Sequence, residues 1–295
     1  MTKLINDPGE VESVRIFTLL DNHAGFGSSF LAQHGLSILL NVASKNVQKN
    51  ILLDTGSTAD TILYNMNILG LKPESIDMVF LTHCHYDHAG GLTGLLKVIN
   101  KEVPVIAHPS IFRENYIFRP GLINAGMAEE NSKQAIINNK GRLVLIAEPF
   151  NLMDGVISTG EVERTVDFEG PGIETYNVQD GKLVRDSIVD DMALVLNLKD
   201  KGLLVVTGCG HAGIINILKH AMKITGINRI FGVIGGLHLI SATSERINKT
   251  ISFFQEMNIR LVLGGHCTGF NALSKMADEL GEKFKYLHSG LTYML

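Results

Sequence analysis

One stretch decides the fold of this 295-residue chain: Thr82-His83-Cys84-His85-Tyr86-Asp87-His88-Ala89-Gly90-Gly91. It places three imidazoles and one carboxylate within six residues, although the whole chain has only 11 histidines. Neutral imidazole is a good ligand for borderline metals, and a carboxylate adds a harder oxygen ligand. A group of surface histidines after a strand is a poor explanation of this density. The stretch therefore predicts a metal centre.

The spacing within the stretch predicts which of its side chains bind the same ion. His83 and His85 lie at positions i and i+2, so in an extended segment both point to one side and reach one ion at about 2.0–2.1 Å. If the chain then turns, Asp87 and His88 face a neighbouring point, which favours two ions about 3.5–4 Å apart. The glycines Gly90 and Gly91 permit such a turn. We expect two divalent ions, zinc first, with iron or manganese as alternatives.

Apolar runs and helical spacing around the stretch indicate strands and helices. The pattern predicts antiparallel strands in the first third of the chain and helix–strand units toward the end. Expected strands cover 14–20, 36–42, 51–54, 78–81, 103–107, 192–198, 203–207, 230–234 and 260–263, with a turn at 46–50. Expected helices cover 58–69, 92–99, 214–225, 244–258 and 274–284.

The expected elements form two similar halves, each with strands followed by helices. They predict an α/β fold of one domain over 1–295, in which two mixed sheets pack face to face between outer helices, an αββα sandwich. Residues 109–190 mix Gly, Asn, Pro and charges with short apolar runs such as 143–147 and 155–158. We expect an irregular insertion or cap there. The polar clusters fall where strands end, which is the usual place for catalytic groups.

Composition limits the class of protein. Hydrophobic residues make up 45% and charged residues 19%, with a net charge of −4, which is typical of a globular protein without a nucleic-acid-binding face. The three cysteines are odd in number and widely spaced, which argues against a disulfide framework. No signal-peptide or membrane-spanning stretch is seen, so we expect a cytoplasmic protein that acts on a small molecule, with a homo-oligomer possible.

The chain resembles the metallo-β-lactamase-fold superfamily, whose signature is His-x-His-x-Asp-His after a buried strand. Three further blocks match that family in the expected order: Leu52-Leu53-Asp54-Thr55-Gly56, Leu203-Leu204-Val205-Val206-Thr207-Gly208-Cys209 and Leu261-Val262-Leu263-Gly264-Gly265-His266. Within the family it resembles the archaeal dihydropteroate-synthase-like enzyme of methanopterin biosynthesis. That similarity rests on His34-Gly35-Leu36-Ser37, on Cys209-Gly210-His211-Ala212-Gly213, on Gly235-Gly236-Leu237-His238-Leu239 and on His266-Cys267-Thr268-Gly269.

The resemblance implies a set of site residues. The expected metal ligands are His83, His85, Asp87, His88, Cys209, His211 and His266, with Asp54 and Asp191 supporting them. Cys209 is either a thiolate ligand or a small buried residue. The family's third motif, a His, is missing, so either Asp191 replaces it or His211 completes the first site. Asp87 would orient a nucleophile, and His238 would bind substrate or donate a proton.

Three functions remain open at this level. The first is a hydrolase, in which metal-bound hydroxide attacks an ester, phosphoester or related bond. The second is a dihydropteroate-synthase-like transferase that joins a pterin diphosphate to an arylamine. It would need a second pocket for the aromatic acceptor, and the aromatic residues of 109–190 permit one. The third is a non-catalytic ligand-binding protein.

Overall fold

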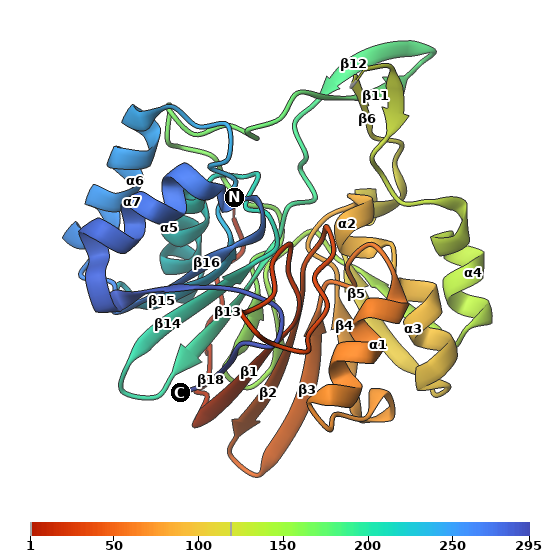
Figure 1. The fold of residues 1–295 in the computed structure, drawn as a ribbon, viewed down its shortest axis with the longest axis horizontal. Helices are drawn as coiled ribbons and strands as arrows, with labels where there is room; N and C mark the ends of the chain where they lie inside the picture. The colour runs from red at the N-terminus through yellow and green to blue at the C-terminus, as the bar shows by residue number, and fades with distance from the viewer. Residues whose placement is uncertain (1, 119) are drawn as a thin grey trace.

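A computed structural model describes residues 2–118 and 120–295, and Figure 1 shows its layers. The first sheet has the strand order β18-β1-β2-β3-β4-β5-β8. Its strands are β1 (Ser13–Leu20), β2 (Ser37–Ser44), β3 (Val47–Leu53), β4 (Met78–Phe80), β5 (Val103–Ala107), β8 (Gly141–Leu145) and β18 (Thr292–Met294). Strands β18 to β3 pair antiparallel, and β3 to β8 pair parallel. This sheet is therefore mixed, as expected.

The second sheet has the order β17-β16-β15-β14-β13-β10-β9. Its strands are β9 (Phe150–Met153), β10 (Val156–Ser158), β13 (Ala193–Leu198), β14 (Gly202–Thr207), β15 (Ile230–Gly236), β16 (Leu261–Gly265) and β17 (Phe284–Tyr286). It too is mixed, with parallel pairing from β14 to β17 and antiparallel pairing from β9 to β14.

Three buried clusters show how the layers pack. One joins the inner faces of the two sheets, and each of the others joins one sheet to its helices. Helices α1 (Ala59–Ile68), α3 (Leu92–Ile99) and α4 (Lys133–Asn138) lie against the first sheet, and α5 (Ile214–Thr225), α6 (Ser244–Glu256) and α7 (Phe270–Leu280) lie against the second (Figure 1). Central strands such as β13 are buried on both faces, which explains their continuous apolar sequence. The expected αββα sandwich is confirmed.

Residues 109–190 are more regular than expected. Strand β8 extends the first sheet, and β9 and β10 extend the second. Only β6 (Tyr116–Phe118), β7 (Leu122–Asn124), β11 (Thr175–Gln179) and β12 (Lys182–Asp186) form a separate four-stranded sheet, which we call the arm. The arm projects from the sandwich at the top of Figure 1.

Two other expectations are wrong in their boundaries. The turn predicted at 46–50 covers only residues 45–46, and β3 already begins at Val47. The first residues of β3 lie outside the core and pair with β2 through the backbone, so the apolar pattern does not mark them. The last helix covers Phe270–Leu280 rather than 274–284, since Gly281 has a φ of 55° and ends it. Phe284 therefore begins β17. The short strands β17 and β18 were not predicted.

The fold brings the site residues to one edge. Asp54 follows β3 and His83 follows β4, while Cys209, His238 and His266 follow β14, β15 and β16. Within each sheet these strands run parallel, so their carboxyl ends meet at the same edge. The short helices α2 (Tyr86–Ala89) and η4 (His266–Thr268) begin there. None of the helices in the described part of the chain is long and apolar enough to span a bilayer.

We expect Phe254→Ala to lower the free energy of unfolding by about 3–5 kcal/mol, because Phe254 on α6 is only 1% exposed and leaves a cavity. Phe270→Ala is the matched control, because Phe270 is 82% exposed, and its effect should stay within about 0.5 kcal/mol. Urea denaturation of both variants measures the difference. Equal losses would show that the α6 packing described above is wrong.

Candidate metal centre

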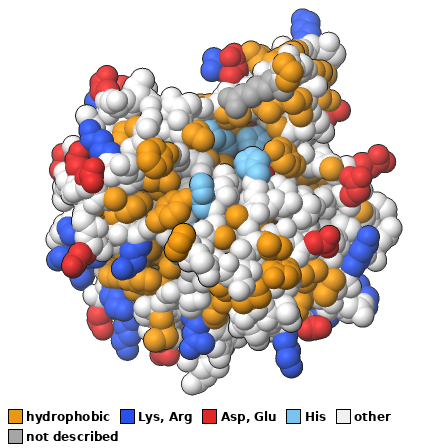
Figure 2. Space-filling model, in the orientation of Figure 1, with side chains coloured by type: hydrophobic (Ala, Val, Ile, Leu, Met, Phe, Trp, Pro, Cys, Tyr) orange, Lys and Arg blue, Asp and Glu red, His pale blue; other side chains and the backbone are white. Residues whose placement is uncertain are grey.

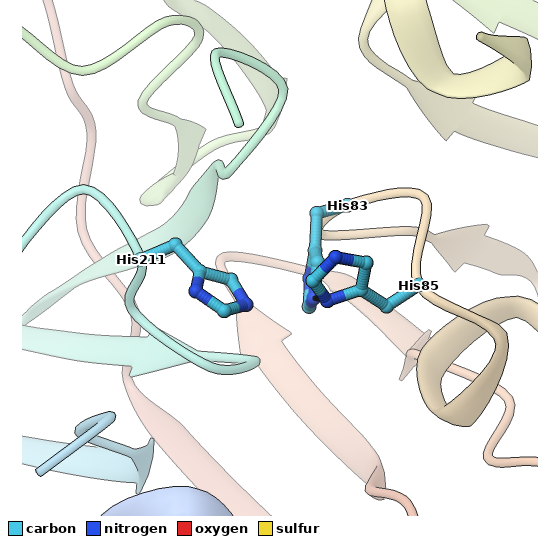
Figure 3. Close-up of side chains that lie close together, drawn as sticks. All are labelled: His83, His85 and His211. Atoms are coloured by element: carbon cyan, nitrogen blue, oxygen red, sulfur yellow. Dashed lines mark hydrogen bonds between the residues drawn. The ribbon is translucent and has the colours of Figure 1, made fainter. Parts of the chain in front are cut away.

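The side chains of His83, His85 and His211 converge, as Figure 3 shows. Their ligand atoms all lie within 4.8 Å of one another, and His83 Nε2 is 3.1 Å from His85 Nδ1. The first two residues come from the segment after β4, and His211 comes from the turn after β14. The prediction that His83 and His85 face the same side agrees with this geometry.

Each of these rings has one nitrogen held by an oxygen outside the group. His83 Nδ1 lies 3.0 Å from Thr82 Oγ1, and His85 Nε2 lies 3.2 Å from Asn115 Oδ1. His211 Nδ1 lies 2.7 Å from the carbonyl oxygen of Pro171, an acceptor only, so this nitrogen carries the proton. His211 Nε2 is buried and has no hydrogen-bond partner among the described residues. Its lone pair faces the other two imidazoles.

Burial also sets the charge of this group. It lowers the pKa of His83 and His211 well below the usual value, and it lowers the pKa of His85, with the neighbouring imidazoles adding to the effect. All three rings are therefore neutral near pH 7. A neutral ring with one oriented N–H is the form that binds a metal.

A second group contains Asp87, His88, Cys209 and His266. His88 Nε2 is 3.1 Å from both Cys209 Sγ and His266 Nε2, and Cys209 Sγ is 3.3 Å from His266 Nε2. Asp87 Oδ2 lies 3.5 Å from His88 Nε2 and 3.4 Å from His266 Nε2. Four ligands at about 2.0–2.1 Å in a tetrahedron are about 3.3–3.4 Å apart, and slightly more when one is sulfur. His88, Cys209 and His266 therefore fit one ion, and Asp87 lies at the distance of a fourth ligand from both imidazoles.

The carboxylate of Asp54 connects the two groups. It accepts hydrogen bonds from Thr82 N and Thr82 Oγ1, both at 2.8 Å, and from His88 Nδ1 at 2.6 Å. Because Thr82 Oγ1 also contacts His83 Nδ1, one carboxylate fixes an imidazole in each group. Gly208 is needed for this packing, since a Cβ there would lie 2.1 Å from Thr82 Oγ1.

His266 is fixed in a similar way from the first sheet. Its Nδ1 lies 3.0 Å from Asn22 Oδ1, and its backbone N–H donates to Asp21 Oδ2 at 2.8 Å. His88 and His266 therefore both present Nε2 to the second group. Across both groups, five imidazoles have one nitrogen bound to an oxygen and the other facing a cluster. This donor set fits two divalent ions that accept nitrogen, oxygen and sulfur ligands.

Asp191 and His238 lie beside the clusters. Asp191 Oδ2 accepts from Ala212 N at 2.8 Å, and burial raises the pKa of Asp191 to about 7. Asp191 therefore braces the residue after His211, and the structure places His211, not Asp191, beside His83 and His85. The ring of His238 is 4.1 Å from that of His211, and its buried Nδ1 has no partner among the described residues.

Several contacting residues were missed by the sequence analysis. Asn22 and Asn115 each orient an imidazole, and nothing in their sequence context distinguishes them from loop asparagines. Asp190 accepts from Cys84 N at 2.8 Å and pairs with Arg113 at 2.7 Å, which fixes the backbone between His83 and His85. The doublet Asp190-Asp191 was a signal for this role. Arg113 lies far from this doublet in the sequence, and nothing near it indicated the same role.

The clusters open into a pocket of about 420 Å³, which we call the metal pocket. His34, also unassigned from the sequence, lines it, with Nε2 3.6 Å from Asp87 Oδ2 and its ring stacked on His266 at 5.8 Å. Ile117 of the arm and Ile173 beside it line the opposite wall. Figure 2 shows histidine side chains reaching the surface in the hollow beneath the arm.

We expect Asp54→Ala to weaken metal binding about 10- to 100-fold, because His88 and Thr82 lose their shared acceptor. Asp60→Ala, an exposed carboxylate on α1, should bind metal like the original protein. Competition with a chelator of known affinity measures both. Unchanged affinity in the Asp54 variant would contradict the bracing role.

We expect His211→Ala to lower the metal content by one ion per chain, since His83 and His85 alone provide two ligands. His220→Ala is the control: His220 on α5 is buried but bonds to the carbonyl oxygen of Thr159, so its loss should lower stability and leave the metal content unchanged. Elemental analysis of the purified variants gives the answer. Loss of an ion in Asp191→Ala, with full content in His211→Ala, would favour the carboxylate instead.

Comparison with known proteins identifies the family of this chain. The family model described as "Metallo-beta-lactamase superfamily" matches residues 34–152, which include the His83–His88 stretch. A Methanocaldococcus jannaschii protein named "7,8-dihydropterin-6-methyl-4-(beta-D-ribofuranosyl)-aminobenzene-5'-phosphate synthase" is 42% identical over 285 residues, covering 96% of this chain and 97% of its own. An uncharacterised protein of the same organism is 34% identical over 92% of this chain and 96% of its own.

A solved structure is also similar over nearly the whole chain. Tm1679, named as a metal-dependent hydrolase of the beta-lactamase superfamily, is 28% identical with a TM-score of 0.78, and the match covers 95% of this chain and 98% of that one. The fold agrees with that of this solved structure over nearly the whole length of both chains. The chain belongs to the metallo-beta-lactamase superfamily, in the group of the archaeal dihydropteroate-synthase-like enzyme.

Proposed function

We propose that this protein is a metal-dependent transferase that joins a pterin diphosphate to an arylamine. The observation that carries the proposal is the 42% identity, over nearly the full length of both chains, to a relative named as a synthase of a dihydropterin–aminobenzene compound. The sequence motifs alone place a hydrolase first and this transferase second. The comparison favours the reverse order.

We assign His83, His85 and His211 to one ion, and Asp87, His88, Cys209 and His266 to a second. Among the described residues that line the metal pocket there is no Lys or Arg. A bound diphosphate would therefore depend on metal charge, and the imidazoles of His34 and His238 are further hydrogen-bonding groups in the lining. When bound, the ions supply positive charge that stabilises the leaving diphosphate.

The reaction that we propose is a substitution at the methylene carbon of the pterin. The amine nitrogen uses its lone pair to form the new C–N bond, the C–O bond to diphosphate breaks with its electron pair, and the amine proton passes to water. His238 lines the metal pocket, with its ring 4.1 Å from that of His211, and we assign it to hydrogen bonding with the diphosphate oxygens. The apolar side chains of Ile117 and Ile173 on the arm side would limit the water that competes with the amine.

Hydrolysis is a second candidate, favoured by the similarity to Tm1679. The same ligands would serve it, with water in place of the amine and Asp87 orienting the nucleophile. The two reactions differ in their products, so one assay distinguishes them.

We expect the purified, zinc-loaded protein to convert a 6-hydroxymethyl-dihydropterin diphosphate and a 4-alkylaniline into a coupled product, with one diphosphate released per coupling. Mass spectrometry measures the coupled product, and a colorimetric assay measures diphosphate. A chelator should abolish both signals, and excess zinc should restore them. His83→Ala should lower the rate at least about 100-fold, because it removes a ligand of the first ion.

Each other outcome has a distinct meaning. Diphosphate release without coupling would favour the hydrolase. No turnover of this pair or of a panel of esters and phosphoesters, in protein with full metal content, would favour a ligand-binding protein and contradict both enzymes.

A further inference from the structure

A second cavity lies next to the metal pocket, between α7 and β17. Its volume is about 530 Å³, and we call it the side groove. Its walls are His23, Phe270, Leu273, Ala277, Phe284 and Tyr286. A cavity of this size holds a ring system of drug-like dimensions. The proposed function requires a place for a second, aromatic substrate, and our sequence analysis looked for it in residues 109–190.

The side groove and the metal pocket are neighbours that share part of their walls. Asn22, Ile240 and His266 line both. His266 belongs to the second ligand group, so one end of the groove lies beside the proposed reaction centre. A molecule in the groove therefore has one end next to a ligand residue.

The chemistry of the lining favours an uncharged, planar ring. Among its described residues there is no Lys, Arg, Asp or Glu. Phe270 and Ile240 are 82% and 63% exposed, and both line the groove, so they offer apolar surface that a ring could cover. The ring of Tyr286 lies 5.6 Å from that of His23, so two flat side chains form part of the wall.

The lining also distinguishes between the two proposed substrates. A pterin carries several donors and acceptors that need partners when buried. Asn22 Oδ1 already accepts from Gly35 N and contacts His266 Nδ1, and the other polar side chains of the lining are His23, Ser274 and Tyr286. The described residues of the lining therefore offer no carboxylate that could accept from the adjacent N–H groups of a pterin. A benzene ring needs no such acceptor.

We propose that the side groove binds the aromatic ring of the acceptor amine, with its nitrogen toward His266 and the opposite end of the ring toward Phe270. The inference rests on the proposed transferase. It assigns the pterin diphosphate to the metal pocket beneath the arm, and it makes α7 a determinant of acceptor specificity.

The test uses the fact that the chain has no Trp. Phe270→Trp introduces a sole reporter at the rim of the groove, and Tyr64→Trp on α1, also exposed, is its matched control. Zinc-loaded proteins are titrated with p-toluidine, an uncharged arylamine. We expect a saturable change in Trp emission for the first variant and only the unspecific, linear change for the second. Identical responses of the two variants would overturn the proposal.

A second pair of substitutions tests the groove without relying on the reporter. Ala277→Phe fills it from α7, whereas Asp278→Phe adds the same side chain to an exposed neighbour outside it. In the coupling assay we expect Ala277→Phe to raise the KM for the arylamine at least about 10-fold and to leave the KM for the pterin diphosphate unchanged. Asp278→Phe should change neither. An equal change in both KM values, or none in Ala277→Phe, would refute the groove.

The two proposals can fail separately. If p-toluidine binding is saturable and is blocked by Ala277→Phe, but no coupled product forms, the transferase is wrong and the groove remains a site for an aromatic ring. Coupling can also occur while Phe270→Trp reports no arylamine binding and Ala277→Phe leaves the KM for the arylamine unchanged. In that case the transferase stands and the groove proposal is wrong.

Discussion

The site depends on the buried carboxylate of Asp54. It is fully buried, and its three hydrogen bonds hold Thr82 and His88 at once, so the segment after β4 cannot shift without breaking them. A buried carboxylate is costly unless such partners satisfy it. The same three hydrogen bonds therefore fix the position of the ligands and the packing of β3 against β4.

Three residues of the site also have an unfavourable backbone conformation. Asp54, His238 and His266 all have a positive φ, of 58°, 44° and 50°. Each follows a buried parallel strand at the edge where the ligands meet. Non-glycine residues in this region cost about 1–3 kcal/mol each, which the surrounding packing must offset. At these three positions the strained backbone is next to the clusters.

The sequence predicted those parts of the fold that depend on local pattern. Helix 92–99 and strand 103–107 match the structure at both ends, because their apolar periodicity is uninterrupted. The stretch His83–His88 predicted the metal centre, because ligand residues adjacent in sequence need no knowledge of the fold. The arm, β17 and β18 were missed since short edge strands have little pattern of their own. Asn22, His34 and Asn115 were missed because only tertiary contacts give loop residues their role.

The turn Cys209-Gly210-His211 has a consequence for both clusters. Its first residue faces one cluster and its third faces the other, so a single three-residue turn contributes to both. The protein itself holds the turn, through the hydrogen bonds from His211 Nδ1 to Pro171 O and from Ala212 N to Asp191 Oδ2. A displacement of this one loop would therefore disturb a donor atom of each cluster at the same time, with no change in either sheet.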